Sequence, residues 1–347
     1  MSQEAPSWES FMEKKSRPKQ PLSNLTTLRK ALHSWFANNG KDLPWRRTRD
    51  PWHILVSEIM LQQTTVTAVI ANRRFEKFLN EFPDLETISS AKEEKLLKAW
   101  EGLGYYNRVR NLQKTAITVL TEFDGDFPQD AKTLETLPGI GKYTAGAVAS
   151  FAFDQPTAIV DANVARVLSR LFDYHKEIDT TAGQRQIWSW AGQLLDPKNP
   201  RLFNSALMEL GQTHCSAKNP GCLLCPLNDF CQSSSPETLP RKKPRQKMIA
   251  VNEHALLCVK RNRIFLTQEK GPRRKGFWRL PLTSAEETAH LEAETEHRYI
   301  ITHHKVTVFL YRVPSIKYEG QFFTKEQIEK LPIPSPIRRI IKCAAFQ

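Results

Sequence analysis

Apolar side chains recur at helical spacing from about residue 23 to residue 215, and no alternating strand pattern or internal repeat interrupts them. The stretch LRKALHSWFANNG places four apolar residues on one helical face: Leu28, Leu32, Trp35 and Phe36. The stretch RDPWHILVSEIMLQQ predicts a helix with Asp50 as its N-cap and Pro51 in its first turn. AKEEKLLKAWEGLG predicts a helix that ends at glycines. We expect further helices over about 105–122, 142–152, 161–172, 181–195 and 201–213.

The pattern changes beyond SSSPETLPRKKPRQK, which is typical of an exposed basic linker. EHALLCVKRNRIFLTQ predicts two strands around a polar turn at Arg261–Arg263, and YIITHHKVTVFLYRV is a second β-rich run. A short helix is expected near 335–345. The predicted organisation is therefore a mainly α domain followed by a smaller α+β domain, with these boundaries: a flexible tail over 1–22, the helical domain over 23–232, the linker over 233–249 and the second domain over 250–347.

Composition narrows the class of protein. The 347 residues are 40% hydrophobic, which is typical of a folded globular chain, and no run approaches the roughly 18 apolar residues of a membrane span. The N-terminus lacks the apolar core of a secretory signal, so a reducing compartment is expected. Lys and Arg outnumber Asp and Glu by 50 to 37, a net charge of +13. This surplus fits a nucleic-acid partner and, equally, a solvated basic surface.

Four of the six cysteines gather in CSAKNPGCLLCPLNDFC, spaced C-x6-C-x2-C-x5-C: Cys215, Cys222, Cys225 and Cys231. Structural zinc usually takes two paired knuckles, whereas only the central pair here has that spacing. A compact loop with uneven spacing favours a 4Fe–4S cluster over zinc, and both over no metal. Cys258 and Cys343 lie in apolar surroundings and are expected to be core residues.

LETLPGIGKYTAGAVAS predicts a short helix, a tight turn and a new helix. Gly139 and Gly141 allow close backbone approach, and the first amides of the helix that starts near Lys142 can point at a phosphate. This is the form of a helix-hairpin-helix element that binds DNA. The alternative is a simple helix–helix turn, which the basic charge and the cysteine loop make less attractive.

Two carboxylates stand out. Glu58 lies within the apolar helix HILVSEIMLQQT, where desolvation should raise its pKa, as suits a general acid; the alternative is a structural carboxylate that pairs with an Arg. Asp161 directly precedes the helix ANVARVLSRL, so it is an expected N-cap. Because a cap receives amide hydrogen bonds and the helix field, we expect it to stay ionised and to be able to stabilise a sugar cation. The pair fits glycosidic bond cleavage.

The hairpin followed by the cysteine loop resembles the helix-hairpin-helix DNA glycosylases with an iron–sulfur loop, the endonuclease III superfamily. LPWR, SEIMLQQT, GLGYYNRVRNL, LPGIGKYTAGAV, DANVARVL and the cysteine loop occur in the order of the MutY-type adenine DNA glycosylases. The second domain is similar in size and position to that family's NUDIX-like domain, which reads 8-oxoguanine. The resemblance thus implies a double-stranded DNA substrate with adenine opposite 8-oxoguanine or guanine.

The resemblance also implies residue roles. Glu58 would protonate the flipped-out adenine, and Asp161 would stabilise or capture the sugar cation, with Tyr143 and Asn163 positioning them. Trp45 and Arg46 would help to line the adenine pocket. The intercalation site beside 8-oxoguanine would hold four residues: Gln63, Thr64, Leu103 and Tyr105.

Departures from the family pattern refine the expectation. Bifunctional relatives carry a lysine nucleophile where this chain has Tyr143, and Lys142 is one residue early, so we expect base excision without strand cleavage. The family's Phe-Ser-His loop is here Ile301-Thr302-His303, so Thr302 and His303 would read the lesion. The second domain lacks the NUDIX hydrolase order of glutamates and is expected to bind only.

Two other functions stay open at this point: a thymine glycosylase for G:T mismatches, and a non-catalytic DNA-binding protein whose cluster senses redox state. Relatives of the first kind usually have basic residues at Gln62-Gln63 and lack a second domain. The protein is expected to be a monomer away from membranes. A DNA substrate implies the cytoplasm, associated with the nucleoid, in a bacterium, or the nucleus or mitochondrion in a eukaryote.

Overall fold

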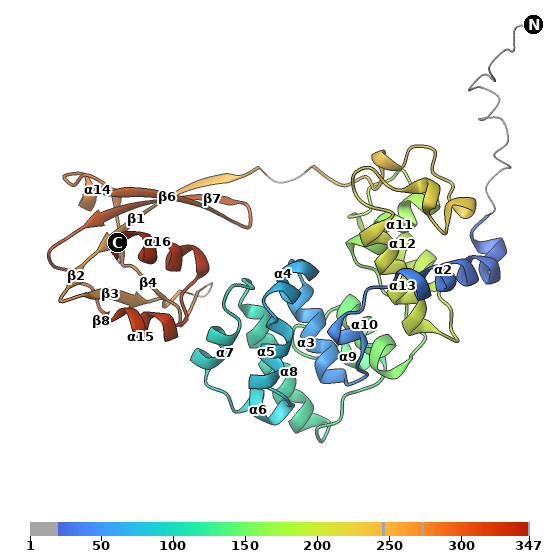
Figure 1. The fold of residues 1–347 in the computed structure, drawn as a ribbon, viewed down its shortest axis with the longest axis horizontal. Helices are drawn as coiled ribbons and strands as arrows, with labels where there is room; N and C mark the ends of the chain where they lie inside the picture. Colours follow the sequence, from blue (N-terminus) through green and yellow to red (C-terminus); the bar gives the residue numbers. More distant parts are fainter. Residues whose placement is uncertain (1–19, 245–246, 272–273, 346–347) are drawn as a thin grey trace, which may run out of the picture. The chain divides into compact units, whose positions relative to one another are not determined.

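The computed structural model describes residues 20–244, 247–271 and 274–345 (Figure 1). Most of the expected tail over 1–22, and part of the expected linker, therefore lie outside the described residues. The chain divides into two compact units, each built from two separate stretches: residues 1–58 with 127–243, and residues 59–126 with 244–347. The domain boundaries expected from the sequence remain a prediction.

The first unit is helical. Its helices are α2 (Leu25–Asn39), α9 (Ala131–Leu134), α10 (Lys142–Phe153), α11 (Ala162–Leu171), α12 (Thr181–Leu194) and α13 (Pro200–Thr213), and α3 (Pro51–Leu61) begins in it. The expected N-cap of α3 is present, because Asp50 Oδ1 accepts from the amide of Trp52 at 2.8 Å. The helices expected over about 142–152, 161–172, 181–195 and 201–213 are confirmed to within two residues at their ends, as is the helix over about 105–122 in the second unit. The helix expected to end at glycines stops earlier, at Ala99, before Gly102.

One apolar core holds this unit together. It gathers Leu28 and Leu32 of α2 with buried residues of α11, α12 and α13. Trp35 and Phe36 pack against it partly buried, as the shared helical face predicts. Gly211 lets α13 approach α11 closely, since a Cβ there would lie 2.7 Å from Cβ of Asn163. The start of α11, where Asp161 and Asn163 stand, is therefore fixed by close packing.

The second unit combines helices and strands. Its first stretch holds α4 (Val66–Ala71), α5 (Arg74–Glu81), α6 (Leu85–Ser89), α7 (Glu93–Ala99) and α8 (Asn107–Glu122). Its second stretch holds β1 (Ile249–Leu257), β2 (Val259–Lys260), β3 (Arg263–Gln268), β4 (Trp278–Arg279), β5 (Leu282–Thr283), β6 (Thr295–Ile301), β7 (His304–Arg312) and β8 (Gln321–Phe323). Three helices accompany these strands: α14 (Ala285–Thr288), α15 (Lys325–Lys330) and α16 (Ser335–Ala345).

The strands form two sheets (Figure 1). The sheet in the order β5-β1-β7-β6 is mixed, because β1 and β7 are parallel and the other pairs are antiparallel. The sheet in the order β2-β3-β4, in which β8 also pairs with β3, is antiparallel throughout. The polar turn is at Arg261 and Asn262, both with positive φ, and it joins β2 to β3. The longer strand before it does not pair with β3 as a simple hairpin would. Instead β1 runs parallel to β7 over nine residue pairs, from Ile249 with His304 to Leu257 with Arg312.

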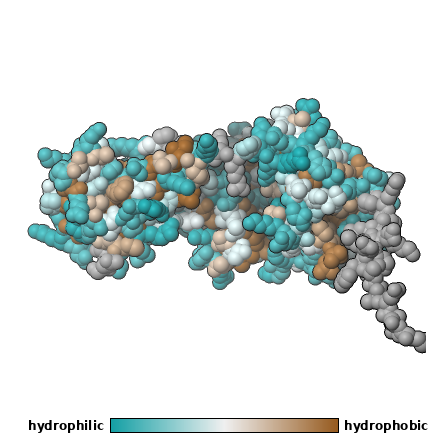
Figure 2. All heavy atoms as spheres, turned by 90° about the horizontal axis from the view of Figure 1, so that it is seen from above, coloured by the Kyte–Doolittle hydropathy of each residue, from teal (hydrophilic) through white to brown (hydrophobic). Residues whose placement is uncertain are grey.

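The α+β character of residues 250–347 is confirmed, and its core joins the strands to Ile337, Ile340 and Ile341 of α16. Cys258 is buried as expected, but the expectation for Cys343 is wrong, because it lies exposed on the face of α16 away from those isoleucines. On the face shown in Figure 2, hydrophilic residues cover most of the surface. None of the helices in the described ranges is long and apolar enough to span a membrane.

Candidate functional site

A buried carboxyl group lies at the centre of the first unit. Glu58, on α3, is 4% exposed, and Tyr143 near the start of α10 donates its hydroxyl to Glu58 Oε2 at 2.8 Å. Burial raises the pKa of Glu58 to about 7, although the hydrogen bond from Tyr143 works in the opposite direction. The Tyr143 hydroxyl has its own pKa raised well above the ordinary range by burial and by the charges of Glu58 and Asp161. Glu58 is therefore able to hold a proton near neutral pH.

Asp161 caps α11, as its position in the sequence predicts. Its Oδ1 accepts from the amide of Val164 at 2.6 Å, and its Oδ2 accepts from the side-chain amide of Asn163 at 2.8 Å. Burial nevertheless raises the pKa of Asp161 from its ordinary value and outweighs these hydrogen bonds. The cap thus opposes, without cancelling, the cost of burying the charge. The negative charge of Asp161 also contributes to the raised pKa of Glu58, so the two carboxyl groups are electrostatic neighbours.

Trp45 and Arg46 lie on a short 3-10 helix, Pro44–Arg46, and Trp45 is 8% exposed. Arg46 pairs with the fully buried carboxylate of Glu209 at 2.8 Å, and its charge lowers the pKa of Glu58 slightly against the effect of burial. Glu209 thus partly neutralises the cation whose charge acts on Glu58. The ion pair was not indicated by the sequence, and the expected place of Trp45 and Arg46 in an adenine pocket remains a prediction.

The cysteine loop contacts α11, the helix that Asp161 caps. Arg166 donates to Oδ1 of Asn163 at 2.9 Å and to the carbonyl of Cys215 at 2.8 Å. Arg170, 1% exposed, donates to the sulfur of Cys215 at 3.2 Å. Arg166 therefore connects Asn163, which contacts the Asp161 cap, to the loop, and Arg170 holds the loop against α11.

All four loop cysteines are free thiols of intermediate burial: Cys215, Cys222, Cys225 and Cys231. They are electrostatic neighbours, since burial and the other three thiols raise the pKa of Cys225 to about 12. In the described ranges, no group of three or more His, Cys, Asp or Glu has an arrangement that could hold a metal ion. The donor set itself, four thiols outside any disulfide on one short loop, fits a thiolate-bound iron–sulfur group by its chemistry.

The predicted hairpin has the expected form. Gly139 has φ +75°, in the left-handed region that favours glycine, and Gly141 caps α10 with extended backbone. A Cβ at Gly141 would meet nothing within 4 Å, so the start of the helix is open to a ligand. Lys142 is exposed and places its Nζ 4.1 Å from the centre of the Trp188 ring, whereas Tyr143 points to Glu58.

The four residues expected at an intercalation site lie in the second unit, on two turns. Gln63 and Thr64 follow α3, whereas Leu103 and Tyr105 lie between α7 and α8. Gln63 and Tyr105 both have positive φ, and Tyr105 is 47% exposed while Leu103 is 6% exposed.

Arg108 joins these two turns. Its guanidinium donates to five backbone carbonyls, those of Ile59, Met60, Gln62, Leu103 and Gly104. Burial lowers its pKa to about 10. One buried cation thus brings the predicted intercalation residues together.

Thr302 and His303 form the turn of the β6–β7 hairpin. Thr302 has φ +52°, and its hydroxyl donates to the carbonyl of Ile301 at 2.7 Å. The His303 ring lies against the ring of His304, with centroids 4.1 Å apart. Ile300 and Ile301 beside the turn are 68% and 41% exposed. The second β-rich run is therefore two antiparallel strands joined by this turn.

Sequence reasoning missed the supporting charged residues, which are Arg108, Arg166, Arg170 and Glu209. A buried ionisable residue in an otherwise apolar helix is the signal that could have found Glu209 and Arg170, as it found Glu58. The partners of Arg108 are backbone carbonyls, which carry no signal of their own in a sequence.

Comparison with known proteins places this arrangement in a family. The model of the HhH-GPD superfamily of base excision DNA repair proteins matches residues 56–193. An adenine DNA glycosylase of Buchnera aphidicola subsp. Baizongia pistaciae (strain Bp) is 35% identical over 251 residues, which cover 71% of this chain and 70% of that protein.

The human adenine DNA glycosylase is 42% identical over 221 residues, which are 61% of this chain but 40% of that protein. The chain thus spans less than half the length of that relative. Among solved structures, a thermostable thymine-DNA glycosylase is 30% identical with a TM-score of 0.55, over 60% of this chain and 95% of that one. The helical fold expected from the motifs is confirmed.

Proposed function

Because this chain belongs to the adenine DNA glycosylases of the HhH-GPD superfamily, we propose that it removes mispaired adenine from double-stranded DNA by hydrolysing the N-glycosidic bond. The observation that carries the proposal is the buried carboxyl group of Glu58, whose pKa of about 7 and bond to Tyr143 suit a general acid. Adenine cannot be reached inside a stacked duplex, so it is first extruded from the helix.

Glu58 supplies the proton. Tyr143 occupies Oε2, which leaves the other carboxyl oxygen to carry a proton toward a ring nitrogen of the extruded base. As the bond between the sugar and the base breaks, its electron pair leaves with the protonated adenine. Protonation makes adenine a better leaving group, and such general acid catalysis is worth roughly 10²- to 10⁴-fold in rate.

Asp161 stabilises the positive charge that develops on the sugar. The amide of Val164 and the side chain of Asn163 fix its two oxygens, so the carboxylate need not reorganise as the charge appears. Asn163 and Tyr143 act as positioning residues for the two carboxyl groups. A water molecule then adds to the sugar carbon and gives a proton to the Glu58 carboxylate, which restores the acid and leaves an abasic site as the product.

The chain ends its reaction there. A lyase step needs an amine that forms a Schiff base, and the position next to Glu58 holds the phenol of Tyr143. Lys142 is directed to Trp188 instead. Borohydride should therefore trap little or no covalent enzyme–DNA adduct. An efficiently trapped adduct that disappears in Lys142→Ala would refute this assignment.

DNA is held by several surfaces. The open amides at the start of α10, with Gly139, Gly141 and Lys142, would hold a phosphate, and Trp45 and Arg46 would line the adenine pocket. The two turns joined by Arg108 would fill the gap that the extruded base leaves, with Gln63, Thr64, Leu103 and Tyr105 beside the opposite base. Thr302 and His303 would distinguish 8-oxoguanine from guanine.

The cysteine loop would hold a 4Fe–4S cluster through Cys215, Cys222, Cys225 and Cys231. The support is the spacing of the four cysteines, the absence of a disulfide at any of them and their electrostatic closeness to one another. When bound, such a cluster cross-links the loop and is capable of electron transfer. Pure protein should be yellow-brown and contain about four irons per chain, which absorption and iron analysis would check. Colourless protein with stoichiometric zinc would exclude the cluster.

One experiment separates the candidate functions. Duplexes that contain A:8-oxoguanine, A:G or T:G pairs are offered under single-turnover conditions. We expect excision of adenine from the first two and none of thymine from the third. The similarity to a solved thymine-DNA glycosylase makes the T:G duplex the necessary control. Excision of thymine alone, or binding without any excision, would overturn the proposal.

A further inference from the structure

The loop between α7 and α8 has an unusual backbone. Gly102, Gly104 and Tyr105 all have positive φ, at +89°, +69° and +46°. The left-handed region is unfavourable for a side chain such as tyrosine, so the surrounding structure must hold it there. Trp100 and Arg108 support the loop from its own helices through the carbonyl of Gly104.

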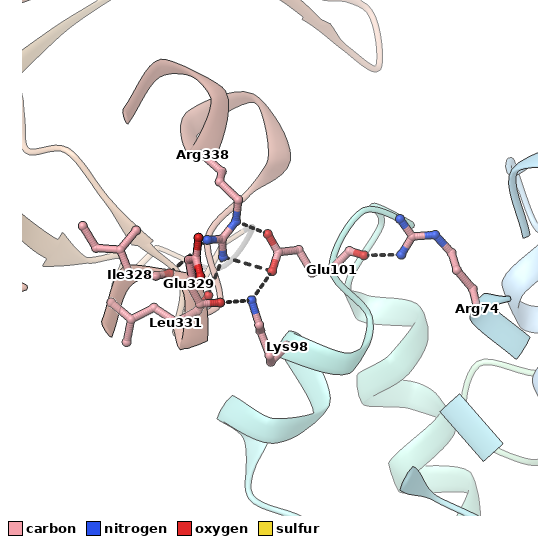
Figure 3. A network of polar contacts seen from close by, with 7 residues as sticks. All are labelled: Arg74, Lys98, Glu101, Ile328, Glu329, Leu331 and Arg338. Atoms are coloured by element: carbon pink, nitrogen blue, oxygen red, sulfur yellow. Dashed lines mark hydrogen bonds and ion pairs between the residues drawn. The ribbon is translucent and has the colours of Figure 1, made fainter. Parts of the chain in front are cut away.

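A second support comes from the C-terminal stretch of the same unit, at the residue that begins the loop. Arg338 of α16 donates both Nε and Nη2 to the carboxylate of Glu101 (Figure 3). Lys98 adds a second cation at 2.7 Å and also donates to the carbonyl of Glu329. Arg74 holds the backbone carbonyl of Glu101.

This ion pair is built into the structure. The side chains of Arg338 and Glu101 are 14% and 16% exposed, so solvent screens them little. Arg338 also donates to the carbonyls of Ile328 at 2.9 Å and Leu331 at 2.7 Å, which fixes the guanidinium before it meets Glu101. Such a forked, preorganised contact gives direction as well as attraction.

The residue that ends the loop is held from the same stretch. The ring of Tyr106 lies 4.2 Å from that of Phe277, which is fully buried. Burial and the charge of Glu101 raise the pKa of Tyr106 to about 12. Arg110, one turn further along α8, donates to the carbonyl of Lys275.

We propose that the C-terminal stretch clamps this loop at both ends, through Arg338 on Glu101 and Phe277 on Tyr106, and thereby positions the exposed Tyr105 for insertion into DNA. Arg338 and Phe277 are thus positioning residues for base extrusion, a step that rests on the proposed function. The C-terminal stretch has a mechanical role in excision as well as its proposed role in reading the lesion.

The clamp is tested first without DNA. Hydrogen exchange is measured at the amides of residues 102–106 in the full-length protein, in Arg338→Ala and in the charge exchange Glu101→Arg/Arg338→Glu. Arg339→Ala is the matched control, because Arg339 is the exposed neighbour on α16. Arg338→Ala should exchange roughly tenfold faster or more in this loop. The control should match wild type, and the charge exchange should restore part of the protection.

The positioning role is tested second, by affinity for a duplex that carries a stable abasic analogue. Arg338→Ala should bind it several-fold more weakly than Arg339→Ala. If Arg338→Ala does not fold, Phe277→Leu, which keeps an apolar side chain, is judged by the same measurements.

The outcomes are separable. Wild-type exchange at 102–106 in the variant would overturn the clamp, and faster exchange with unchanged DNA affinity would overturn its role in positioning. If the wild-type protein neither binds nor cleaves the duplex, the proposed function fails, while the exchange result still decides whether the clamp exists.

Discussion

The Glu58 site and the two turns joined by Arg108 hold their functional residues in opposite ways. At the first, Glu58 of α3 lies buried, Tyr143 of α10 contacts it directly, and Asp161 at the start of α11 is its electrostatic neighbour. At the second, the side chains of Tyr105 and Gln63 are exposed. Their positions are set by the backbone of the two turns, whose carbonyl groups accept hydrogen bonds from Arg108.

The difference follows from what each region has to do. A carboxyl group keeps its proton near neutral pH only if it is desolvated, so the chemistry requires burial. A residue that enters DNA must be exposed before it binds, so it cannot be positioned by packing around its side chain. Its position must come from a rigid backbone, and buried cations on carbonyl oxygens supply that rigidity.

The strongest way to break this comparison is to remove the acid. Glu58→Gln keeps the shape and can still accept from Tyr143, but it has no acidic proton to give. Excision of adenine should fall by roughly 10²- to 10⁴-fold, whereas affinity for the duplex stays within about twofold. Single-turnover rates and a binding titration check this, with Glu237→Gln at an exposed position as the control. Normal excision by Glu58→Gln would exclude Glu58 as the acid.

Replacing Arg108, the cation that joins the two turns, should instead lower stability and DNA binding and leave the acid chemistry of Glu58 unchanged. Arg108→Met leaves buried carbonyls without a donor, so we expect a loss of roughly 3 kcal/mol in the free energy of unfolding and weaker DNA binding. The pH dependence of excision should not change, because Glu58 is untouched. Urea denaturation and binding would be compared with Lys114→Met, an exposed position on the same helix. Equal effects of the two changes would contradict the role given to Arg108.

The burial of Glu58 should also be visible as a cost in stability. The pKa of Glu58 is raised from 4.5 to about 7, so the folded protein holds this proton more tightly than the unfolded chain does. The resulting contribution to the free energy of unfolding is fully present below pH 4.5 and is lost as the pH rises through 7. The loss amounts to about 3 kcal/mol, since each unit of pKa corresponds to roughly 1.4 kcal/mol, and a glutamine does not suffer it. Glu58→Gln should therefore be more stable than wild type at pH 8 but not at pH 4. Denaturation curves at both pH values would show this, and an equal difference at both would contradict it.

The smallest effect is expected at the hairpin turn. Thr302→Ala/His303→Ala should reduce the preference for A:8-oxoguanine over A:G by about fivefold, or about 1 kcal/mol, and leave excision at A:G unchanged. The ratio of the two rates measures this, with Thr295→Ala at the far end of β6 as the control. An unchanged ratio would show that the turn does not read the lesion. A chain that ends near residue 232 should lose more, because it also lacks Arg338 and Phe277.

Much of the Glu58 site could be predicted because each of its parts has a local signature. A carboxylate in an apolar helix and an aspartate before a periodic run are both visible within about ten residues of sequence. Their meeting is not local, since the bond from Tyr143 to Glu58 joins residues 85 positions apart. The prediction that Tyr143 lies beside Glu58 came from the resemblance to a known family. The periodicity of the sequence alone did not indicate it.

The turns and the C-terminal sheets could be predicted less well. The strand β1 has the composition of a strand, but its parallel partner β7 follows about fifty residues later, and nothing in either strand specifies that pairing. The raised pKa of Asp161 depends on burial by several elements, which a cap motif does not report. Cys343 lies in an apolar stretch of sequence, yet it is exposed, because it is not on the face of α16 that buries Ile337, Ile340 and Ile341.

The contact between Arg338 and Glu101 has a consequence for the synthesis of the chain. The two residues are 237 positions apart, so at roughly 5 to 20 residues per second Arg338 is added about 12 to 47 seconds after Glu101. During that interval Glu101 of the nascent loop has Lys98 but not Arg338 as a partner, and the Tyr106 ring lacks its contact with Phe277. The second unit therefore cannot complete its fold while residues 59–126 are being synthesised, because the loop gains both of these contacts only when the stretch that contains Phe277 and Arg338 has been added.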